Sequence, residues 1–179
     1  MTDIASHRVF FALWPDVASR GALVAAAKAA SAICGGRRQR DENLHLTLAF
    51  LGTVTSAKLD TLLAVGNGVR AAPYTLCFDR LGYWQHNRIV WAGCSEVPSA
   101  QRRLFALLAD SLAAAGFRLD SRPHVPHVTL VRQARCATQL PELAPIPWRV
   151  TEFTLVESHL AQEGARYEVL ARWPLMEGA

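Results

Sequence analysis

The sequence lacks the features that mark several large classes of protein. No run approaches the roughly 20 apolar residues that a membrane helix needs, and the start of the chain has neither the basic segment nor the unbroken apolar segment of a signal peptide. Phosphate loops of the G-x-x-x-x-G-K type and the G-x-S-x-G nucleophile elbow are also missing. We therefore expect a cytoplasmic protein without membrane contact, ATP use or a serine nucleophile.

Cysteine is scarce, and its spacing is uninformative. The four cysteines, Cys34, Cys77, Cys94 and Cys136, lie far apart with no C-x-x-C pair among them. Such spacing does not match a metal site, and the composition is not that of a disulfide-rich secreted domain. We expect all four to be free thiols in core or strand positions.

Lysine is almost absent from the basic residues, because 17 of the 19 are arginine. The net charge of +4 favours an anionic partner, and the planar guanidinium group is well suited to grip phosphate. Arginine in place of lysine on an ordinary solvated surface would give the same composition. The same two interpretations apply to the basic loop Arg37, Arg38 and Arg40, which either guides a nucleic-acid backbone or is simply solvated.

The composition predicts one globular domain over residues 1–179, made of two closely packed lobes. Of the 179 residues, 51% are apolar and 19% are charged, which is enough to bury a core. Strands are predicted at 8–14, 44–51, 74–78, 88–93, 127–132, 148–157 and 167–173, and helices at 16–31, 56–69 and 98–116. Because strands come in groups and helices singly, we expect an α+β fold with mainly antiparallel sheet.

One motif occurs twice, 82 positions apart, as His45-Leu-Thr47-Leu and His127-Val-Thr129-Leu. Two such matches arise by chance in well under roughly 1% of chains of this composition. On a strand, residues i and i+2 point to the same face, so each imidazole stands beside a hydroxyl. The repeat indicates a diverged duplication whose two halves face one another about a pseudo-twofold axis.

Two histidines that face one phosphate suit acid and base catalysis without a metal. A neutral imidazole can accept a proton from attacking water, and a protonated one can give a proton to a departing ribose oxygen. Thr47 and Thr129 would then hydrogen-bond the non-bridging phosphoryl oxygens. A ribose 2′,3′-cyclic phosphate fits such a site, because its leaving oxygen stays tethered to the sugar.

Five segments of the chain resemble the two-histidine phosphoesterases, namely R-V-F-F-A-L-W-P, E-N-L-H-L-T-L-A-F-L-G, R-I-V-W-A-G, P-H-V-T-L-V-R and R-Y-E-V-L. The similarity runs from about Arg8 to Trp173 and is strongest to the bacterial RNA 2′,3′-cyclic phosphodiesterases, historically called LigT or 2′-5′ RNA ligases. The resemblance implies a bilobal fold with a central groove between sheets, helices on the outside, hydrolysis to a 2′-phosphate, and no metal or other cofactor.

The resemblance also implies a role for individual residues. His45 resembles the family's proton donor to the leaving 3′-oxygen, His127 the base that activates water, and Thr47 and Thr129 its phosphate ligands. Arg132 matches a family arginine, although strict strand alternation places it opposite His127 unless a bulge intervenes.

Two further positions leave their alternatives open. Phe11 matches an aromatic position that could stack on a base, although a buried core residue fits equally well. His124, in the doubled Pro-His of this chain, is expected at the rim of the groove rather than as a metal ligand with His127, because Pro126 prevents helical geometry. His7, His86 and His159 belong to no pattern and receive no role.

We expect the partner to be an RNA or nucleotide with a 2′,3′-cyclic phosphate end, and the protein to be a monomer. Two alternatives remain at this point. One is 2′-5′ RNA ligation, the reverse reaction at the same site, and the other is a non-catalytic module that only binds RNA or nucleotides.

Overall fold

The computed structural model describes residues 6–120, 123–161 and 164–176, and for residues 160 and 161 it describes the backbone alone. Over these residues the chain forms three α-helices, one 3-10 helix and ten strands. The helices are α1 (Val17–Cys34), η1 (Asp41–Asn43), α2 (Ser56–Gly68) and α3 (Ser99–Ala114). The strands are β1 (Ser6–Leu13), β2 (Arg37–Arg38), β3 (Leu46–Thr55), β4 (Tyr74–Phe78), β5 (Arg80–Trp84), β6 (Ile89–Gly93), β7 (His127–Arg132), β8 (Ile146–Val150), β9 (Glu152–Ala161) and β10 (Gly164–Pro174).

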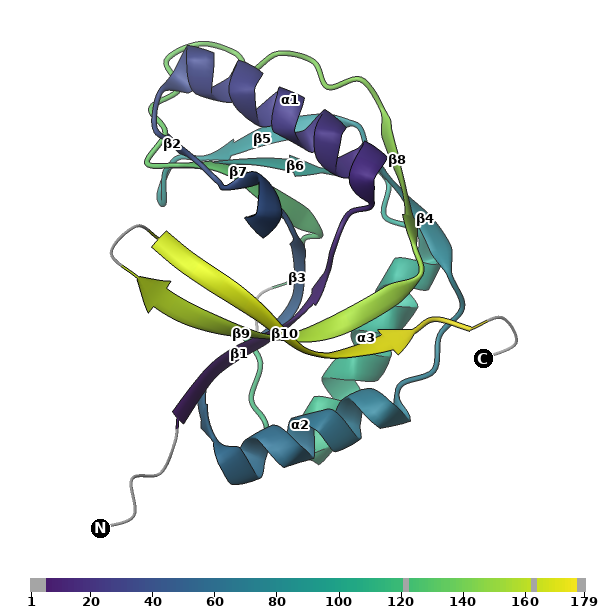
Figure 1. The fold of residues 1–179 in the computed structure, drawn as a ribbon. Coiled ribbons are helices and arrows are strands. Elements are labelled where there is room, and N and C mark those ends of the chain that lie inside the picture. Colours follow the sequence, from purple (N-terminus) through teal and green to yellow (C-terminus); the bar gives the residue numbers. More distant parts are fainter. Residues whose placement is uncertain (1–5, 121–122, 162–163, 177–179) are drawn as a thin grey trace.

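One large sheet runs through both halves of the molecule. Its strand order is β10-β9-β1-β3-β7-β6-β5, with β2 beside β7, and β4 pairs with β8 in a separate two-stranded sheet. The pairings among the described strands are antiparallel. Among the described residues of β3 and β7, only Leu46 and Val128 are paired in register. The halves therefore meet at the first residues of the two strands that carry the repeated motif, and diverge beyond them (Figure 1).

The helices lie outside this sheet, on different halves. Helix α1 packs against β7 and β8, whereas α2 and α3 pack together against the half that contains β1 and β3 (Figure 1). The expected α+β architecture, with mainly antiparallel sheets and outer helices, is confirmed.

Alternation along β1 separates two hydrophobic clusters. Val9, Phe11 and Leu13 enter the main core under the helices. Phe10 and Ala12 point the other way and form a small cluster with Val156. The second cluster lies beneath the site described below, so β1 links the core directly to the site.

Helix α1 begins and ends at clear sequence signals. The Asp16 side chain accepts a hydrogen bond from the backbone N–H of Ser19 at 2.7 Å, and Gly35 adopts the positive φ of 60° that ends many helices. By length and composition alone this helix could cross a membrane, contrary to our expectation that no segment would pass that test. In the fold its buried alanines, Ala26, Ala27 and Ala30, lie in the main core.

Several strands differ from their predicted limits. Residues 148–157 form parts of two strands, β8 and β9, because β8 pairs with β4 whereas β9 pairs with β1. Strand β5 was not predicted. The basic loop contains the short strand β2, which pairs with the end of β7 through Arg37 and Arg132. The sequence also predicts a turn at Gln162-Glu163-Gly164 between the last two strands, and Gln162 and Glu163 lie outside the described residues.

The expectation that all cysteines are free was wrong for two of them. Cys34, at the end of α1, forms a disulfide with Cys136, 102 positions away. The Arg135 N–H donates to the Cys34 carbonyl at 2.8 Å, so the segment after β7 is held against the end of α1. Cys77 and Cys94 are free. Spacing along the chain could not reveal this pair, because the packing of α1 on β7 brings it together.

The disulfide predicts a measurable loss of stability when it is removed. A closed loop of this length restricts the unfolded chain, so Cys136→Ser should lower the free energy of unfolding by about 2–4 kcal/mol in urea titrations without reductant. Cys77→Ser, at an exposed free thiol, serves as the control. Identical urea midpoints for the oxidised and reduced wild-type protein would contradict the prediction.

Candidate active site

Both repeated motifs line one large cavity between the halves of the sheet. The cavity has a volume of about 1200 Å³. Its walls include the two motif histidines and threonines together with Arg132, that is His45, Thr47, His127, Thr129 and Arg132. The structure thus brings together five of the six residues predicted for the site.

His45 lies just before β3 and is packed among aromatic rings. Its Nδ1 atom is 2.7 Å from the backbone carbonyl of Asn43. The rings of Phe10, Trp14 and Tyr167 have their centroids 5.0, 5.2 and 5.2 Å from the imidazole centroid. These rings fix the orientation of the imidazole and keep water from most of its surface.

His127, at the start of β7, repeats this arrangement from the other half. Its Nδ1 atom is 2.7 Å from the backbone carbonyl of Val125, again two residues earlier. The Trp84 ring meets the imidazole edge to face, with centroids 4.6 Å apart. The two histidines therefore have equivalent backbone anchors and different aromatic neighbours.

The backbone anchors select the tautomer of each imidazole. A carbonyl oxygen can only accept a hydrogen bond, so Nδ1 carries the hydrogen and donates it. In the neutral ring Nε2 is then the unprotonated nitrogen. Each histidine is prepared to accept a proton at Nε2, or to donate one from Nε2 once the ring is protonated.

The surroundings favour the neutral form of both imidazoles. Burial is the main cause that lowers the pKa of His45 to about 4; the positive charges of Arg132 and His127 act in the same direction, and the bond to Asn43 opposes them. Burial also lowers the pKa of His127, again with a contribution from Arg132. A bound phosphate anion would offset these effects, because it stabilises the imidazolium form.

Arg132 reaches the cavity because β7 contains an irregularity. The pairing of β7 with β6 shifts register between Val90 and Trp91, and Leu130 and Val131 are buried one after the other. This break in alternation returns Arg132 to the side of His127. The bulge considered from the sequence is therefore present, and Arg132 lies in the site.

A second irregularity, in β3, changes the predicted faces of two residues. Strict alternation from His45 would place Ala49 on the face of His45 and Thr47, and Phe50 on the opposite, apolar face. The register of β1 with β3 shifts between Phe11 and Ala12. Ala49 is 5% exposed and belongs to the main core, whereas Phe50 is 49% exposed; both residues border the cavity.

The predicted base-stacking role of Phe11 is wrong. Its side chain is fully buried in the main core, where it packs against Phe153 and Trp173. Its neighbour Phe10 is the aromatic residue of β1 that lines the cavity. Two adjacent phenylalanines on one strand must face opposite ways, and the sequence does not show which of them faces the core.

Several cavity residues were not predicted from the sequence. Tyr167 and Trp84 contact the two imidazoles, and His86, which received no role, also lines the cavity. Tyr167 belongs to the R-Y-E-V-L segment. Alternation along a strand could have indicated that Tyr167 and Glu168 face opposite sides of the sheet. Nothing in the sequence pairs it with His45, because that contact depends on the position of β10 in the sheet.

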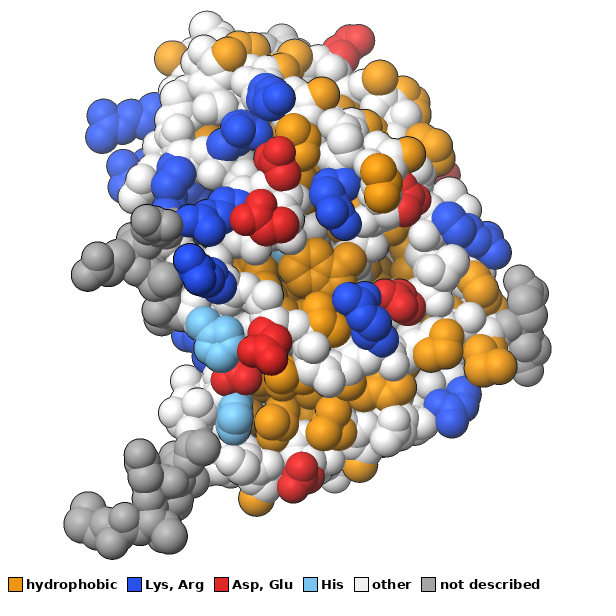
Figure 2. Space-filling model, in the orientation of Figure 1, with side chains coloured by type: hydrophobic (Ala, Val, Ile, Leu, Met, Phe, Trp, Pro, Cys, Tyr) orange, Lys and Arg blue, Asp and Glu red, His pale blue; other side chains and the backbone are white. Residues whose placement is uncertain are grey.

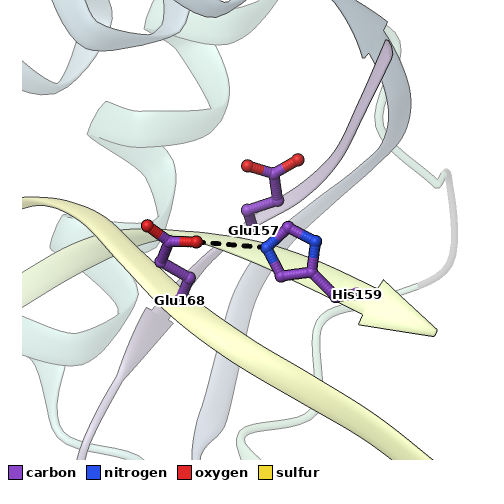
Figure 3. Close-up of side chains that lie close together, drawn as sticks. All are labelled: Glu157, His159 and Glu168. Atoms are coloured by element: carbon purple, nitrogen blue, oxygen red, sulfur yellow. Dashed lines mark hydrogen bonds and ion pairs between the residues drawn. The ribbon is translucent and has the colours of Figure 1, made fainter. Parts of the chain in front are cut away.

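A separate group of side chains could ligate a metal ion. The ligand atoms of Glu157, His159 and Glu168 lie within 4.8 Å of one another on β9 and β10 (Figure 3). His159 pairs with Glu168 at 3.2 Å and His7 with Glu157 at 3.0 Å. Glu157 is opposite Val9 in the sheet, so this group lies on the face away from the cavity. It therefore takes no part in chemistry at His45 and His127.

A smaller hollow of about 410 Å³ lies beside α1 and β10. Its lining mixes basic and acidic side chains around Trp14 and Tyr167. Figure 2 shows apolar side chains at the bottom of a hollow with charges of both signs around it, and basic side chains that gather over the end of α1 and β2. The mixed charge of this hollow is less suited to a phosphate than the cavity of the two histidines.

Comparison with known proteins gives a consistent result. The family model for LigT-like phosphoesterases matches residues 15–91 and 93–167. The RNA 2′,3′-cyclic phosphodiesterase of Escherichia coli (strain K12) is 38% identical over 144 residues, which cover 79% of this chain and 81% of that protein. The protein of the same name from Thermus thermophilus is 30% identical and covers 94% of this chain and 90% of its own.

Solved structures agree in fold over nearly the whole chain. E. coli LigT in its apo form superposes with a TM-score of 0.88 at 35% identity, covering 96% of this chain and 99% of that one. The complex of E. coli LigT with 3′-AMP gives a TM-score of 0.89 at 35% identity, covering 97% and 100%. Fold, motifs and sequence similarity together show that this chain belongs to the LigT-like phosphoesterase family.

Proposed function

We propose that this protein hydrolyses RNA 2′,3′-cyclic phosphate ends to 2′-phosphates. The observation that carries the proposal is the pair of imidazoles, each anchored through Nδ1 to its own backbone, that line one cavity with Arg132. The RNA 2′,3′-cyclic phosphodiesterase name of the relatives supports the same substrate class.

The reaction needs two proton transfers, and the site provides a group for each. The oxygen of a water molecule attacks phosphorus and gives its proton to Nε2 of a neutral imidazole. The bond from phosphorus to the ribose 3′-oxygen breaks, and that oxygen takes a proton from Nε2 of the protonated imidazole. Arg132 and the two threonines stabilise charge on the remaining phosphoryl oxygens.

The family resemblance assigns the donor role to His45 and the base role to His127. Because the pKa of His45 is about 4 in the free protein, this imidazole is neutral at pH 7. In the proposed mechanism His45 therefore gains its proton when the phosphate anion binds beside it, since the anion compensates for burial and for Arg132. His127, with its lowered pKa, is already neutral and can act as the base.

We further propose that the protein acts as a monomer and without a bound metal ion. The five residues of the reaction all come from one chain. The proton transfers use side chains alone, so the scheme needs no metal-bound water.

The proposal predicts hydrolysis in the presence of EDTA. Purified protein should convert a 2′,3′-cyclic nucleotide to the 2′-phosphate. Chromatography of the products measures this conversion. His45→Ala and His127→Ala should each lower kcat by about 10²–10⁴-fold, the usual loss of one acid or base group. His159→Ala, on the other face of the sheet, is the matched control.

Other outcomes would point to the alternative functions. If both cavity variants keep full turnover while RNA binding depends on Arg132, the cavity is a binding site only. A joined product with 5′-hydroxyl RNA, in place of the 2′-phosphate, would show ligation.

The lowered pKa values predict an acidic optimum for kcat/KM. The reaction needs one protonated imidazole, and in the free protein this form is lost as pH rises above the lowered pKa. The pH optimum of kcat/KM should therefore lie below 6.5. The pH optimum of kcat should lie higher, because bound phosphate favours the imidazolium form. NMR titration should place His45 of the free protein at about 4.

Arg132→Gln tests the cause of these shifts. Removal of the positive charge should raise the pKa of both imidazoles, move the kcat/KM profile to higher pH and increase KM. Arg132→Lys, which retains the charge, should leave the profile nearly in place. A titration of His45 near 6.5 in the wild-type protein would contradict the account of burial.

A further inference from the structure

The cavity is larger than one reacting nucleotide needs. Its volume of about 1200 Å³ exceeds the range of about 300–1,000 Å³ that is usual for small-molecule sites. Its lining is not confined to the two histidines and includes residues of β1, β3, α3 and the segment before β7. We call this part the far end of the cavity, lined by Arg8, Phe50, Phe105, Leu119, Asp120 and His124.

We propose that the far end binds the nucleobase of the nucleotide that precedes the cyclic phosphate, and so selects an RNA chain over a mononucleotide. This inference rests on the proposed function, because the same histidines position the reacting phosphate. It adds a second binding site for a flat aromatic group with an adjacent phosphodiester.

Phe50 provides one surface of this site. Its ring is 49% exposed although it belongs to a strand of the central sheet. The guanidinium carbon of Arg8 lies 4.7 Å from the ring centroid. Aromatic rings and guanidinium planes are the groups on which unpaired bases stack in RNA-binding proteins.

Phe105 and His124 provide a second aromatic surface of the cavity. Their rings are stacked, with centroids 4.1 Å apart and an angle of 8° between the planes. Phe105 comes from α3 and His124 from the segment before β7, so the stack joins two elements at the cavity wall. Val125, beside His124, is 41% exposed and also lines the cavity. Exposed apolar side chains around one cavity are typical of a ligand surface.

The position of Phe50 separates this site from that of the reacting nucleotide. Phe50 follows His45 by five residues, which separates them by at most about 17 Å along the strand direction, and Phe50 is paired in the sheet with Phe10, whose ring centroid is 5.0 Å from that of His45. Phe10, Tyr167 and Trp84 already surround the two imidazoles, where the base on the reacting ribose would lie. Phe50 is therefore within reach of the next nucleotide of the chain.

The charge of the cavity fits an RNA chain. Five arginines line it, and the carboxylate among its described lining residues is that of Asp120. Arg8 stands beside Phe50, where the phosphodiester between the two nucleotides would pass. A mononucleotide cyclic phosphate has no such linkage and would leave this part of the cavity unused.

The test compares three substrates that differ only beyond the reacting ribose. These are a mononucleotide 2′,3′-cyclic phosphate, a dinucleotide ending in the same group, and that dinucleotide with an abasic first residue. For the wild-type protein kcat/KM should be highest for the intact dinucleotide. Phe50→Ala should lower the ratio of dinucleotide to mononucleotide kcat/KM by about 5- to 150-fold, the loss expected for one stacked base, and Phe50→Trp should preserve it.

The abasic substrate shows whether the ring contacts the base. The wild-type protein should lose the same factor on the abasic dinucleotide, and Phe50→Ala should add nothing to that loss. Equal loss on mononucleotide and dinucleotide would overturn the proposal, because Phe50 would then serve the reacting nucleotide. Undiminished kcat/KM of Phe50→Ala on both substrates would overturn it as well.

A binding measurement separates failure of this inference from failure of the proposed function. The probes are a fluorescent dinucleotide and mononucleotide that each end in a 2′-phosphate, which need no turnover. Tighter binding of the dinucleotide that is lost in Phe50→Ala would support the far end even if no hydrolysis occurred. Equal affinity for both probes would contradict the far end even in an active enzyme.

Discussion

The site depends on one contact between the halves of the large sheet, the antiparallel pairing of Leu46 with Val128. Each of these residues directly follows a motif histidine. The contact therefore places both imidazoles at the same junction, while the strands diverge beyond it and leave space for a substrate. Both leucine and valine are fully buried, so the position of the reacting groups is determined by the hydrophobic core rather than by flexible loops.

Burial also sets the chemistry at this junction. The rings of Phe10, Trp14 and Tyr167 that orient His45 also disfavour its charge, so positioning and the lowered pKa have the same origin. The bond from Nδ1 to a backbone carbonyl offsets part of this cost and selects the reactive nitrogen. The imidazoles of such a site stay uncharged until an anion binds beside them. Protonation of the histidine that acts as the acid is then coupled to substrate binding.

The sequence predicted the parts of the structure that follow from local pattern. Helix α1 after Asp16, helix α3 and the two motif strands are set by capping residues and periodicity. The repeat alone was enough to predict that His45, Thr47, His127 and Thr129 lie around one cavity. Features that depend on register could not be predicted. Bulges in β3 and β7 expose Phe50 and return Arg132 to the site, and the choice between Phe10 and Phe11 depends on which face of β1 meets the helices. The Cys34–Cys136 bond depends on packing between distant segments.

The close pairing of β2 with the end of β7 limits which residues the chain can carry at position 36. Gly36 has a φ of 85°, and a Cβ atom there would lie 2.6 Å from the carbonyl oxygen of Arg132 and 2.9 Å from the backbone nitrogen of Ala134. These neighbours are backbone atoms that cannot rotate away. Even an alanine at this position would have to separate β2 from β7, and the guanidinium group of Arg132 would move with the strand that carries it. A residue without a side chain thus helps to hold the guanidinium group of Arg132 in the cavity.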